Sequence, residues 1–473
     1  MTLSSKLCAL RVALWGPPPA SALEARLIRK IDFLVLTFTC LMYWSNYLSR
    51  TGFQFAYVSG MSEDLSFQGN DYSIANTLFT VGYVLGMIPN ILALQVVSPH
   101  YWLPGAAALW AGLAMCLAAA KNPAQVFAIR FLQGLVEAST FAGSHYILGS
   151  WYTETEIGKR SGIFASSAQL GSLFSGVIQG GIHTNMDGYR GLRSWQWQFL
   201  LDGFIGIPIA LYGFIFFPDV PRRARKWLLT EEERKLAIER LPRRQQVKTR
   251  MGWSLIKRVL GRWHWYAFSA LFAWSSMLES IGSNGLFALW LQAERYPVRD
   301  RNYWPLALQA VAISSTIIAA AVTDLPSIPR WTVNPVMAVS LIFTSIVLLI
   351  WTVPFGLKFA AFTIGGMGYA GQATNFSWAN IVCAGDEQER AVVLASMNMW
   401  SSTVQAWWSI VFYPATDAPR FRRGWIAMIC IAVVTLSVKA HEQPGFRSTP
   451  AVSLHRRSER GCCNIGSIPL RRG

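Results

Sequence analysis

Charged side chains are scarce in this sequence. Asp, Glu, Lys and Arg make up only 14% of its 473 residues, whereas 52% of the residues are hydrophobic. Soluble domains carry about 25% charged residues. The shortfall coincides with apolar stretches of about 20 residues, the length that a helix needs to cross the hydrocarbon core of a membrane. This composition excludes an ordinary soluble domain and indicates a membrane protein.

Patterns that carry catalysis or metal binding are also missing. Most of the seven cysteines lie singly inside apolar segments, without the spacing of a metal site or a disulfide framework. Ser, His and Asp are scattered and form no nucleophile elbow. The glycines of Gly365–Gly368 follow no expected strand, so we interpret them as points of close helix packing and not as a nucleotide loop. We therefore predict no enzyme, no cofactor and no bound metal.

Twelve segments have the length and apolarity of membrane-spanning helices. Strands are excluded because an open strand cannot satisfy its backbone hydrogen bonds in lipid. The first segment is the least obvious, and we extend it beyond Tyr43 through the mostly uncharged stretch Asn46–Met61. The fold class is an all-α membrane protein. The expected spans are residues 31–60, 74–95, 101–120, 125–150, 161–182, 198–217, 264–292, 303–323, 331–353, 356–383, 391–413 and 424–438.

Lys and Arg concentrate in one segment between these spans. Fourteen of the 42 basic residues lie in residues 218–263, and the net charge is +17. Basic loops stay on the cytosolic side of a membrane, so this segment and both termini are expected in the cytosol. The charge could attract nucleic acid, but its position between apolar segments favours membrane orientation. We predict the lipid bilayer as partner, no nucleic acid, and a monomeric chain.

The basic segment divides the chain into two halves of six spans. The expected parts are a cytosolic tail (1–30), a first half (31–217), a cytosolic basic loop (218–263), a second half (264–438) and a disordered, basic cytosolic tail (439–473). Within the loop, Thr230–Glu233 has the pattern of a capping box, which predicts a short surface helix.

A weak internal repeat relates the two halves. Lys159–Ser166 and Arg390–Ser396 share a basic start and an Ala-Ser pair at an offset of 230 residues, and each follows an acidic cluster. We assign structural roles to Glu156, Arg160 and Arg390 at these helix starts. Paired halves with a site between them near mid-membrane are a common plan of transporters.

Charged residues within the spans should each face a partner or a water-filled cavity, because charge at bilayer depth costs about 2.5–3.5 kcal/mol. Arg130 and Glu137 lie on one face of the fourth span, about 10 Å apart along its axis. Arg130 either extends to the lipid boundary or pairs structurally with Asp202. Glu137 either handles substrate and protons or forms an interhelical bond.

Arg50 is the basic residue of the first span beyond its cytosolic end. Its guanidinium can bind a carboxylate with two parallel hydrogen bonds, or it forms a structural pair with Glu137. Glu279, Gln372 and Asn375 are polar candidates of the second half; the two amides either bind the solute or hold helices together. The predicted substrate-binding residues are Arg50, Asn46, Gln372 and Asn375, Glu137 is the proton-coupling residue, and Arg130 and Asp202 are structural charges.

A set of short motifs carries a family resemblance. The motifs are Tyr57–Met61, Phe79–Tyr83, Ile88–Asn90, Arg130–Gly134, Gly368–Asn380, Gln388–Ala391, Ala395–Trp400 and Tyr413–Pro419. Over about residues 24–437 the chain resembles the fungal allantoate permease family of the major facilitator superfamily, especially its pantothenate-transporter-like members in the anion:cation symporter group. This resemblance implies the major facilitator fold and uptake of small organic anions, such as vitamins and ureido acids, often driven by protons.

Three features depart from that family. Ser49 stands where the family carries Asp, the loop after the second span is reduced to Ser98–Trp102, and the chain after Lys439 is not similar. Our main hypothesis is a secondary active carrier of the plasma membrane that works by alternating access and is coupled to protons. Two alternatives stay open: a nutrient receptor of the same fold that does not transport, and an efflux carrier for a small metabolite.

Overall fold

The computed structural model describes residues 21–68, 71–225, 227–241, 253–296, 303–325, 328–414 and 417–437, together with Pro19 and Asp300. These residues form helices and short connections, and no strand occurs among them. The expected tail 439–473, residues 1–18 of the N-terminal tail and residues 242–252 of the basic loop lie outside the described part of the chain.

The first span is one continuous helical run. It consists of α2 (Ala22–Ile31), a π-helical turn (Asp32–Leu36), α3 (Thr37–Ala56), a second π-helical turn (Tyr57–Met61) and α4 (Ser62–Asp64). The predicted extension beyond Tyr43 is therefore confirmed. The remaining helices of the first half are α5 (Asp71–Val96), α6 (Pro99–Leu117), α7 (Pro123–Glu137), α8 (Thr140–Trp151), α9 (Ile157–Asn185) and α10 (Ser194–Phe216).

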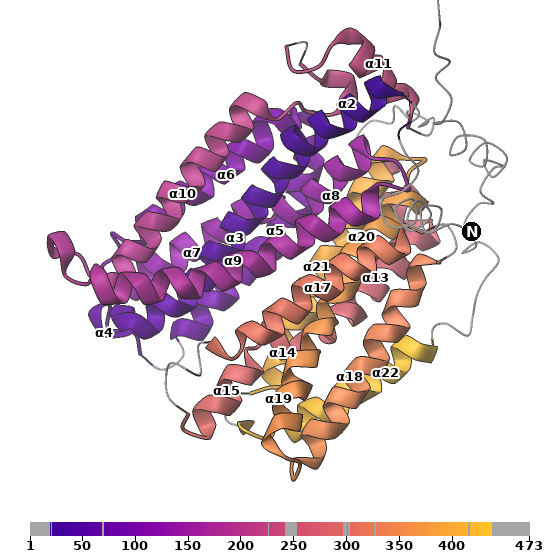
Figure 1. Ribbon diagram of the computed structural model, residues 1–473. Helices are drawn as coiled ribbons and strands as arrows, with labels where there is room; N and C mark the ends of the chain where they lie inside the picture. Colours follow the sequence, from indigo (N-terminus) through magenta and orange to yellow (C-terminus); the bar gives the residue numbers. More distant parts are fainter. Residues whose placement is uncertain are drawn as a thin grey trace, which may run out of the picture. The chain divides into compact units, whose positions relative to one another are not determined.

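The connecting segment and the second half follow along the chain (Figure 1). The connection holds α11 (Glu231–Glu239) and α12 (Trp253–Leu260). The helices that follow are α13 (Trp263–Met277), α14 (Ser280–Ser283), α15 (Leu286–Ala293), α17 (Leu306–Thr323), α18 (Val333–Ile350), α19 (Phe355–Ile364), the 3₁₀ segment η6 (Gly365–Ala370), α20 (Gly371–Val382), α21 (Glu387–Phe412) and α22 (Arg422–Ser437). The described residues are therefore all-α, as predicted, and form two successive sets of helices.

The offset of 230 residues extends over the whole of both halves. Adding 230 to the first residues of α5, α6, α7, α9 and α10 gives 301, 329, 353, 387 and 424. Their counterparts α17, α18, α19, α21 and α22 begin at 306, 333, 355, 387 and 422. The interruption between α7 and α8, at residues 138 and 139, likewise corresponds to η6 (138 + 230 = 368). Residues related by this offset therefore hold equivalent places in the two halves to within about five residues.

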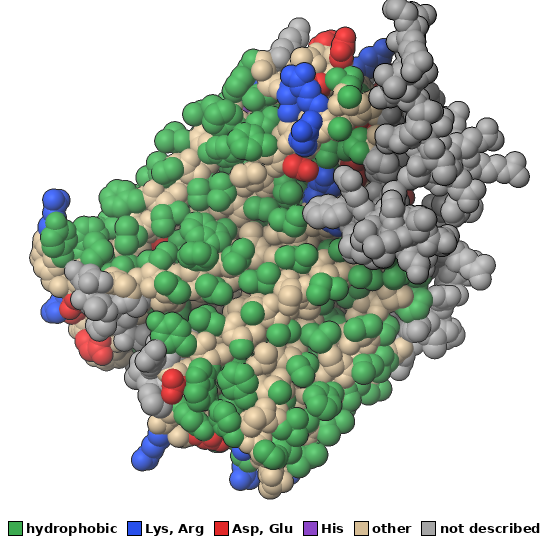
Figure 2. All heavy atoms as spheres, viewed as in Figure 1, with side chains coloured by type: hydrophobic (Ala, Val, Ile, Leu, Met, Phe, Trp, Pro, Cys, Tyr) green, Lys and Arg blue, Asp and Glu red, His purple; other side chains and the backbone are tan. Residues whose placement is uncertain are grey.

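Lipid-facing surface accounts for the scarcity of charge. Figure 2 shows hydrophobic side chains covering the middle of the helices on one face, with charged side chains near the helix ends. Large apolar side chains such as Leu85, Phe204 and Ile410 are exposed on α5, α10 and α21. Within the described residues, four helices are long and apolar enough to cross a membrane by length and composition alone: Ile74–Val96, Ser194–Phe216, Leu306–Thr323 and Arg330–Ile350.

Helices α5 and α7 cross in direct backbone contact at two glycines. A Cβ on Gly134 would lie 2.0 Å from the Phe79 carbonyl oxygen, and a Cβ on Gly82 would lie 2.2 Å from the Phe131 carbonyl oxygen. Small residues permit such close approach between membrane helices. This crossing fixes the position of Tyr83 on α5 relative to Glu137 on α7.

Two glycines of the second half also lie where helices approach closely. A Cβ on Gly366 would lie 2.3 Å from the Leu308 carbonyl oxygen, and a Cβ on Gly368 would lie 2.5 Å from the Leu278 carbonyl oxygen. The interpretation of Gly365–Gly368 as a point of close helix packing is therefore confirmed.

Replacement of Gly134 by alanine tests the α5–α7 crossing. We expect Gly134→Ala to destabilise the protein by about 1–3 kcal/mol because the new methyl group overpacks a backbone contact. Gly112→Ala, on α6, is the matched control because a Cβ there meets no atom within 4 Å. The thermal unfolding midpoint of each purified variant in detergent gives the comparison. Equal midpoints for the two variants would contradict the crossing.

The loop face, defined as the end of the helices where segment 218–263 lies, is rich in ion pairs. The capping box predicted at Thr230–Glu233 starts α11, since the Thr230 hydroxyl accepts from the Glu233 amide and the Glu233 carboxylate from the Thr230 amide. Glu233 also accepts from Lys30 at 2.7 Å, which holds α11 beside α2 at the upper right of Figure 1. The short helix predicted from the sequence thus anchors the connection to the first half.

Three of the five charges to which the sequence assigned structural roles, Glu156, Arg160 and Arg390, lie at this face. Arg160 binds both oxygens of Asp32, at 2.6 and 2.9 Å, and Glu156 pairs with Arg240 at 3.2 Å. Arg390 is almost fully buried and donates to the Gly149 carbonyl and the Ser150 hydroxyl of the other half, each at 3.0 Å. These contacts are consistent with structural roles.

Asp324 adds a second link between the halves at the loop face. Its carboxylate follows α17 of the second half, yet it accepts from the Gly158 and Lys159 amides at the start of α9, at 3.1 and 2.8 Å. These amides would otherwise lack partners within their own helix. Together with Arg390, this link holds the two halves together at the loop face.

Candidate functional site

Arg50 and Glu137 form an ion pair inside the first half. Arg50 lies on α3, and Glu137 is the last residue of α7. The Arg50 Nε donates to Glu137 Oε2 at 3.0 Å, and Glu137 is 1% exposed. Among the described residues, no protein group accepts a hydrogen bond from the two terminal nitrogens of Arg50. Those nitrogens can therefore donate to a second carboxylate in the bidentate geometry that guanidinium favours.

Three aromatic rings surround the Arg50 guanidinium. Its central carbon lies 4.5 Å from the ring centre of Tyr83, 4.8 Å from that of Phe79 and 5.4 Å from that of Tyr47. Cation–π contacts of this kind stabilise a desolvated cation and limit its movement. The sequence prediction missed these rings, although Phe79 and Tyr83 lie four residues apart and therefore on one face of α5.

Asn46 lies one turn before Arg50 on α3 and has no protein partner. It is 1% exposed, and neither its amide nitrogen nor its amide oxygen has a hydrogen-bond partner among the described residues. An unsatisfied buried polar group costs about 1–3 kcal/mol. A side chain of this kind next to Arg50 is suited to a polar ligand.

Neither alternative given for Arg130, pairing with Asp202 or extension to the lipid boundary, matches its contacts among the described residues. Arg130 is 3% exposed, so it does not extend to the lipid boundary. Its guanidinium lies between the rings of Phe53 and Phe79, at 4.4 and 4.3 Å, and donates to Gln133 and Asn76. The rings of α3 and α5 and the amides of α5 and α7 therefore hold it away from the carboxylate on α10.

Asp202 lies against the backbone of α3 instead. It accepts from Gln198 at 3.2 Å, and a Cβ on Gly52 would lie 3.0 Å from its Oδ2. Asp202 is thus a buried acid of helix packing within the first half.

The second half places an acid and an amide in contact. Glu279 lies at the interruption between α13 and α14, and Gln372 lies in the first turn of α20, directly after η6. The Gln372 Nε2 donates to Glu279 Oε2 at 2.8 Å. Glu279 and Glu137 therefore both lie where a membrane helix is interrupted, which is where transporter sites are commonly built.

Asn375 is engaged in helix packing. Its amide exchanges hydrogen bonds with that of Asn334 on α18, at 3.1 and 3.3 Å, and both side chains are buried. Of the two roles that the sequence left open for Asn375, the structure favours the bridge between helices over a contact with substrate. Gln372 and Asn375 therefore do not act as a pair, because their partners lie on different helices.

A hydrogen bond connects the surroundings of Arg50 to the second half. The Asn398 amide on α21 donates to the Tyr83 hydroxyl on α5 at 2.9 Å. This hydrogen bond joins the ring that lies against Arg50 to the second half. The candidate site therefore consists of Arg50, Glu137 and Asn46 on one side and of Glu279 and Gln372 on the other.

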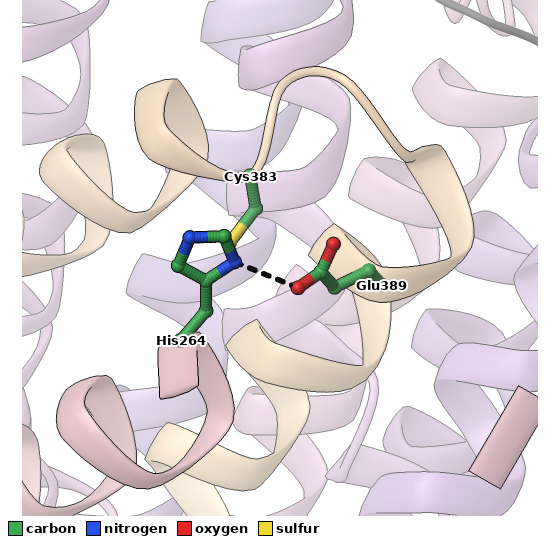
Figure 3. A group of neighbouring side chains, drawn as sticks. All are labelled: His264, Cys383 and Glu389. Carbon is green, nitrogen blue, oxygen red and sulfur yellow. Dashed lines mark hydrogen bonds and ion pairs between the residues drawn. The ribbon is translucent and has the colours of Figure 1, made fainter. Parts of the chain in front are cut away.

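A separate cluster of His264, Cys383 and Glu389 lies at the loop face. Figure 3 shows the His264 ring next to the Cys383 sulfur and hydrogen-bonded to Glu389, at 2.8 Å. The three potential ligand atoms lie within 4.8 Å of one another, and such residues ligate Zn²⁺ elsewhere. The second oxygen of Glu389 pairs with Arg262, however, so both oxygens are already bonded. The cluster is thus satisfied as an ionic network.

Electrostatics at Glu389 agree with that assignment. Glu389 precedes the expected span 391–413. Burial alone would raise the pKa of its carboxyl group, but the hydrogen bond from His264 and the charge of Arg262 outweigh burial and hold the pKa below its usual value. Glu389 is therefore an ionised member of the network at neutral pH.

A family model described as Major Facilitator Superfamily matches residues 39–409. Among curated proteins, the pantothenate transporter FEN2 of Saccharomyces cerevisiae is 44% identical over 424 residues, which cover 87% of this chain and 82% of that protein. The pantothenate transporter liz1 of Schizosaccharomyces pombe is 38% identical over 410 residues, covering 86% and 80%.

Solved structures agree on the fold. The structure of the proton:xylose symporter XylE matches with a TM-score of 0.68 and covers 88% of this chain and 96% of that one. The sequence identity of 12% limits this likeness to architecture.

Proposed function

The chain belongs to the Major Facilitator Superfamily, and we propose that it carries a small organic anion, a carboxylate such as a vitamin or a ureido acid, in symport with protons. As a member of this superfamily with pantothenate transporters as relatives, it is an integral membrane transporter of a small organic substrate and not an enzyme. We further propose that it groups with the pantothenate-transporter-like members of the allantoate permease family.

The observation that carries the anion proposal is the Arg50–Glu137 pair. A partly buried cation whose Nε is bonded and whose terminal nitrogens have no protein acceptor among the described residues is prepared for a carboxylate. The unpartnered amide of Asn46 one turn away supplies further hydrogen bonds. The substrate carboxylate and Glu137 then compete for one guanidinium, and protonation of Glu137 releases Arg50 to the substrate.

Alternating exposure of the site to the two sides of the membrane completes the proposed transport cycle. The halves are joined at the loop face through Arg390 and Asp324, so opening on that side must break these hydrogen bonds. Rocking of two halves around a central site is the common mechanism of such folds. The basic connection 218–263 supports cytosolic termini and a cytosolic loop face. We place the protein in the plasma membrane, as a monomer.

Uptake into proteoliposomes tests the proposal. We expect purified protein to accumulate radiolabelled pantothenate against its gradient when the outside is more acidic, and to lose accumulation when a protonophore removes the pH difference. Pantothenate binding without any uptake would favour the receptor hypothesis, for which Ser49 is the sequence observation. Downhill flux that ignores the pH difference would exclude proton coupling.

A further inference from the structure

Glu279 has a carboxylate oxygen that no protein group uses. The side chain is 5% exposed, Oε2 accepts from Gln372, and Oε1 has no hydrogen-bond partner among the described residues. The salt bridges of the described chain include no cation paired with Glu279. A buried acid of this kind needs a hydrogen-bond donor that the described protein does not supply.

The internal repeat gives the position of Glu279 relative to Arg50. Subtracting the offset of 230 from residue 279 gives residue 49, and Ser49 directly precedes Arg50 on α3. Equivalent places in two repeated halves lie at the same depth on opposite sides of the site between them. The repeat therefore places the cation and the unpartnered acid at similar depths on the two halves that enclose one site.

We propose that Glu279, held by Gln372, accepts a hydrogen bond from a donor group of the substrate at the end away from its carboxylate. This inference rests on the proposed anion function, because Arg50 must hold the carboxylate. It defines the substrate class more narrowly, as a carboxylate with a hydroxyl, amide N–H or ammonium group at its far end.

The arrangement of Arg50 and Glu279 determines the orientation of the bound substrate as well as its chemical class. Arg50 attracts the carboxylate of the substrate, and the free Oε1 of Glu279 accepts a hydrogen bond only from a donor group, so only one orientation of the substrate is favourable. A site built around a buried acceptor discriminates strongly against an analogue that lacks the donor, because the acceptor is then left without a partner. Simple alkyl carboxylates should consequently bind poorly even though Arg50 can hold them.

Binding of matched anions to purified protein tests the inference. The probes are pantothenate, its analogue in which the hydroxyl farthest from the carboxylate is replaced by hydrogen, and hexanoate, which has no distal donor. We expect the wild type to prefer pantothenate over both others by about tenfold or more. Glu279→Gln should weaken the binding of pantothenate by a similar factor and leave the binding of hexanoate unchanged, so the preference for pantothenate is lost.

Asp202→Asn is the matched control. Asp202 is also buried and also has an oxygen without a partner among the described residues, but it lies against α3 within the first half. That variant should keep the wild-type preference.

Two outcomes would overturn the inference and leave the anion function intact. One is a Glu279→Gln protein with the wild-type preference, and the other is a wild type that binds hexanoate as tightly as pantothenate. If Glu279→Gln does not fold, the wild-type comparison decides alone. Binding of no carboxylate at all would overturn the proposed function, and this inference with it.

Discussion

Arg50→Ala should abolish recognition of the anion while leaving the protein folded. The substitution removes the cation whose terminal nitrogens would hold the carboxylate with two charge-assisted hydrogen bonds, worth about 1.5–3 kcal/mol each in comparable cases. Affinity should fall by about 100-fold or more. Arg50→Lys keeps the charge but loses the planar fork, so we expect an intermediate loss of about tenfold.

The measurement is anion affinity in purified variants that elute and unfold like the wild type. Arg222→Ala, which removes an exposed arginine of the loop face, controls for the loss of one positive charge. The double variant Arg50→Ala with Glu137→Gln separates the loss of the anion-binding cation from the loss of the ion pair. It removes both partners of the pair and so leaves no uncompensated buried acid. Near wild-type affinity in Arg50→Ala would reduce Arg50 to a structural partner of Glu137.

The architecture followed from the sequence because lipid constrains a chain severely. Backbone groups that meet no water must bond within a helix, so uncharged stretches of sufficient length could be interpreted only as helices. Arg50 illustrates the strength of that rule: it lies in a stretch too polar to be an obvious span, and the helix nevertheless continues through it to Asp64. The repeat of 230 residues, visible in a few matching letters, also extended to the helix bounds.

The partners of individual polar residues were less predictable. The Arg50–Glu137 pair could be anticipated because two opposite charges in lipid must meet. Arg130 and Asp202 satisfied the same argument and yet do not pair, because Arg130 finds aromatic rings and amides instead.

Spacing along one helix was equally insufficient for Gln372 and Asn375. Residues three apart share a helix face, but the neighbouring helix decides what each one meets, and here Asn334 and Glu279 lie on different helices. The hydrogen-bond partner of each polar residue depends on how its helix is rotated against the neighbouring helices, and a single sequence does not specify that rotation.

Glu137→Gln should abolish uphill accumulation and leave exchange of substrate across the membrane. The amide oxygen of the introduced glutamine can still accept the hydrogen bond from Arg50 Nε, so the cation stays in place between its aromatic rings. The amide carries no charge, however, and it cannot take up or release a proton. The variant is therefore fixed in the form that leaves Arg50 available to the anion at every pH, and the link between proton binding and anion binding is lost.

Two assays on one preparation separate these effects. Counterflow, in which internal unlabelled substrate drives entry of labelled substrate, needs only binding and alternation of the two halves, so it should continue in Glu137→Gln. Accumulation driven by a pH difference needs the proton link, so inside and outside concentrations should merely equalise. Asp202→Asn, a buried acid that contacts neither Arg50 nor the second half among the described residues, should accumulate substrate like the wild type. If accumulation survives Glu137→Gln and fails in Asp202→Asn, the proton binds on α10 and the Arg50–Glu137 pair serves the anion alone.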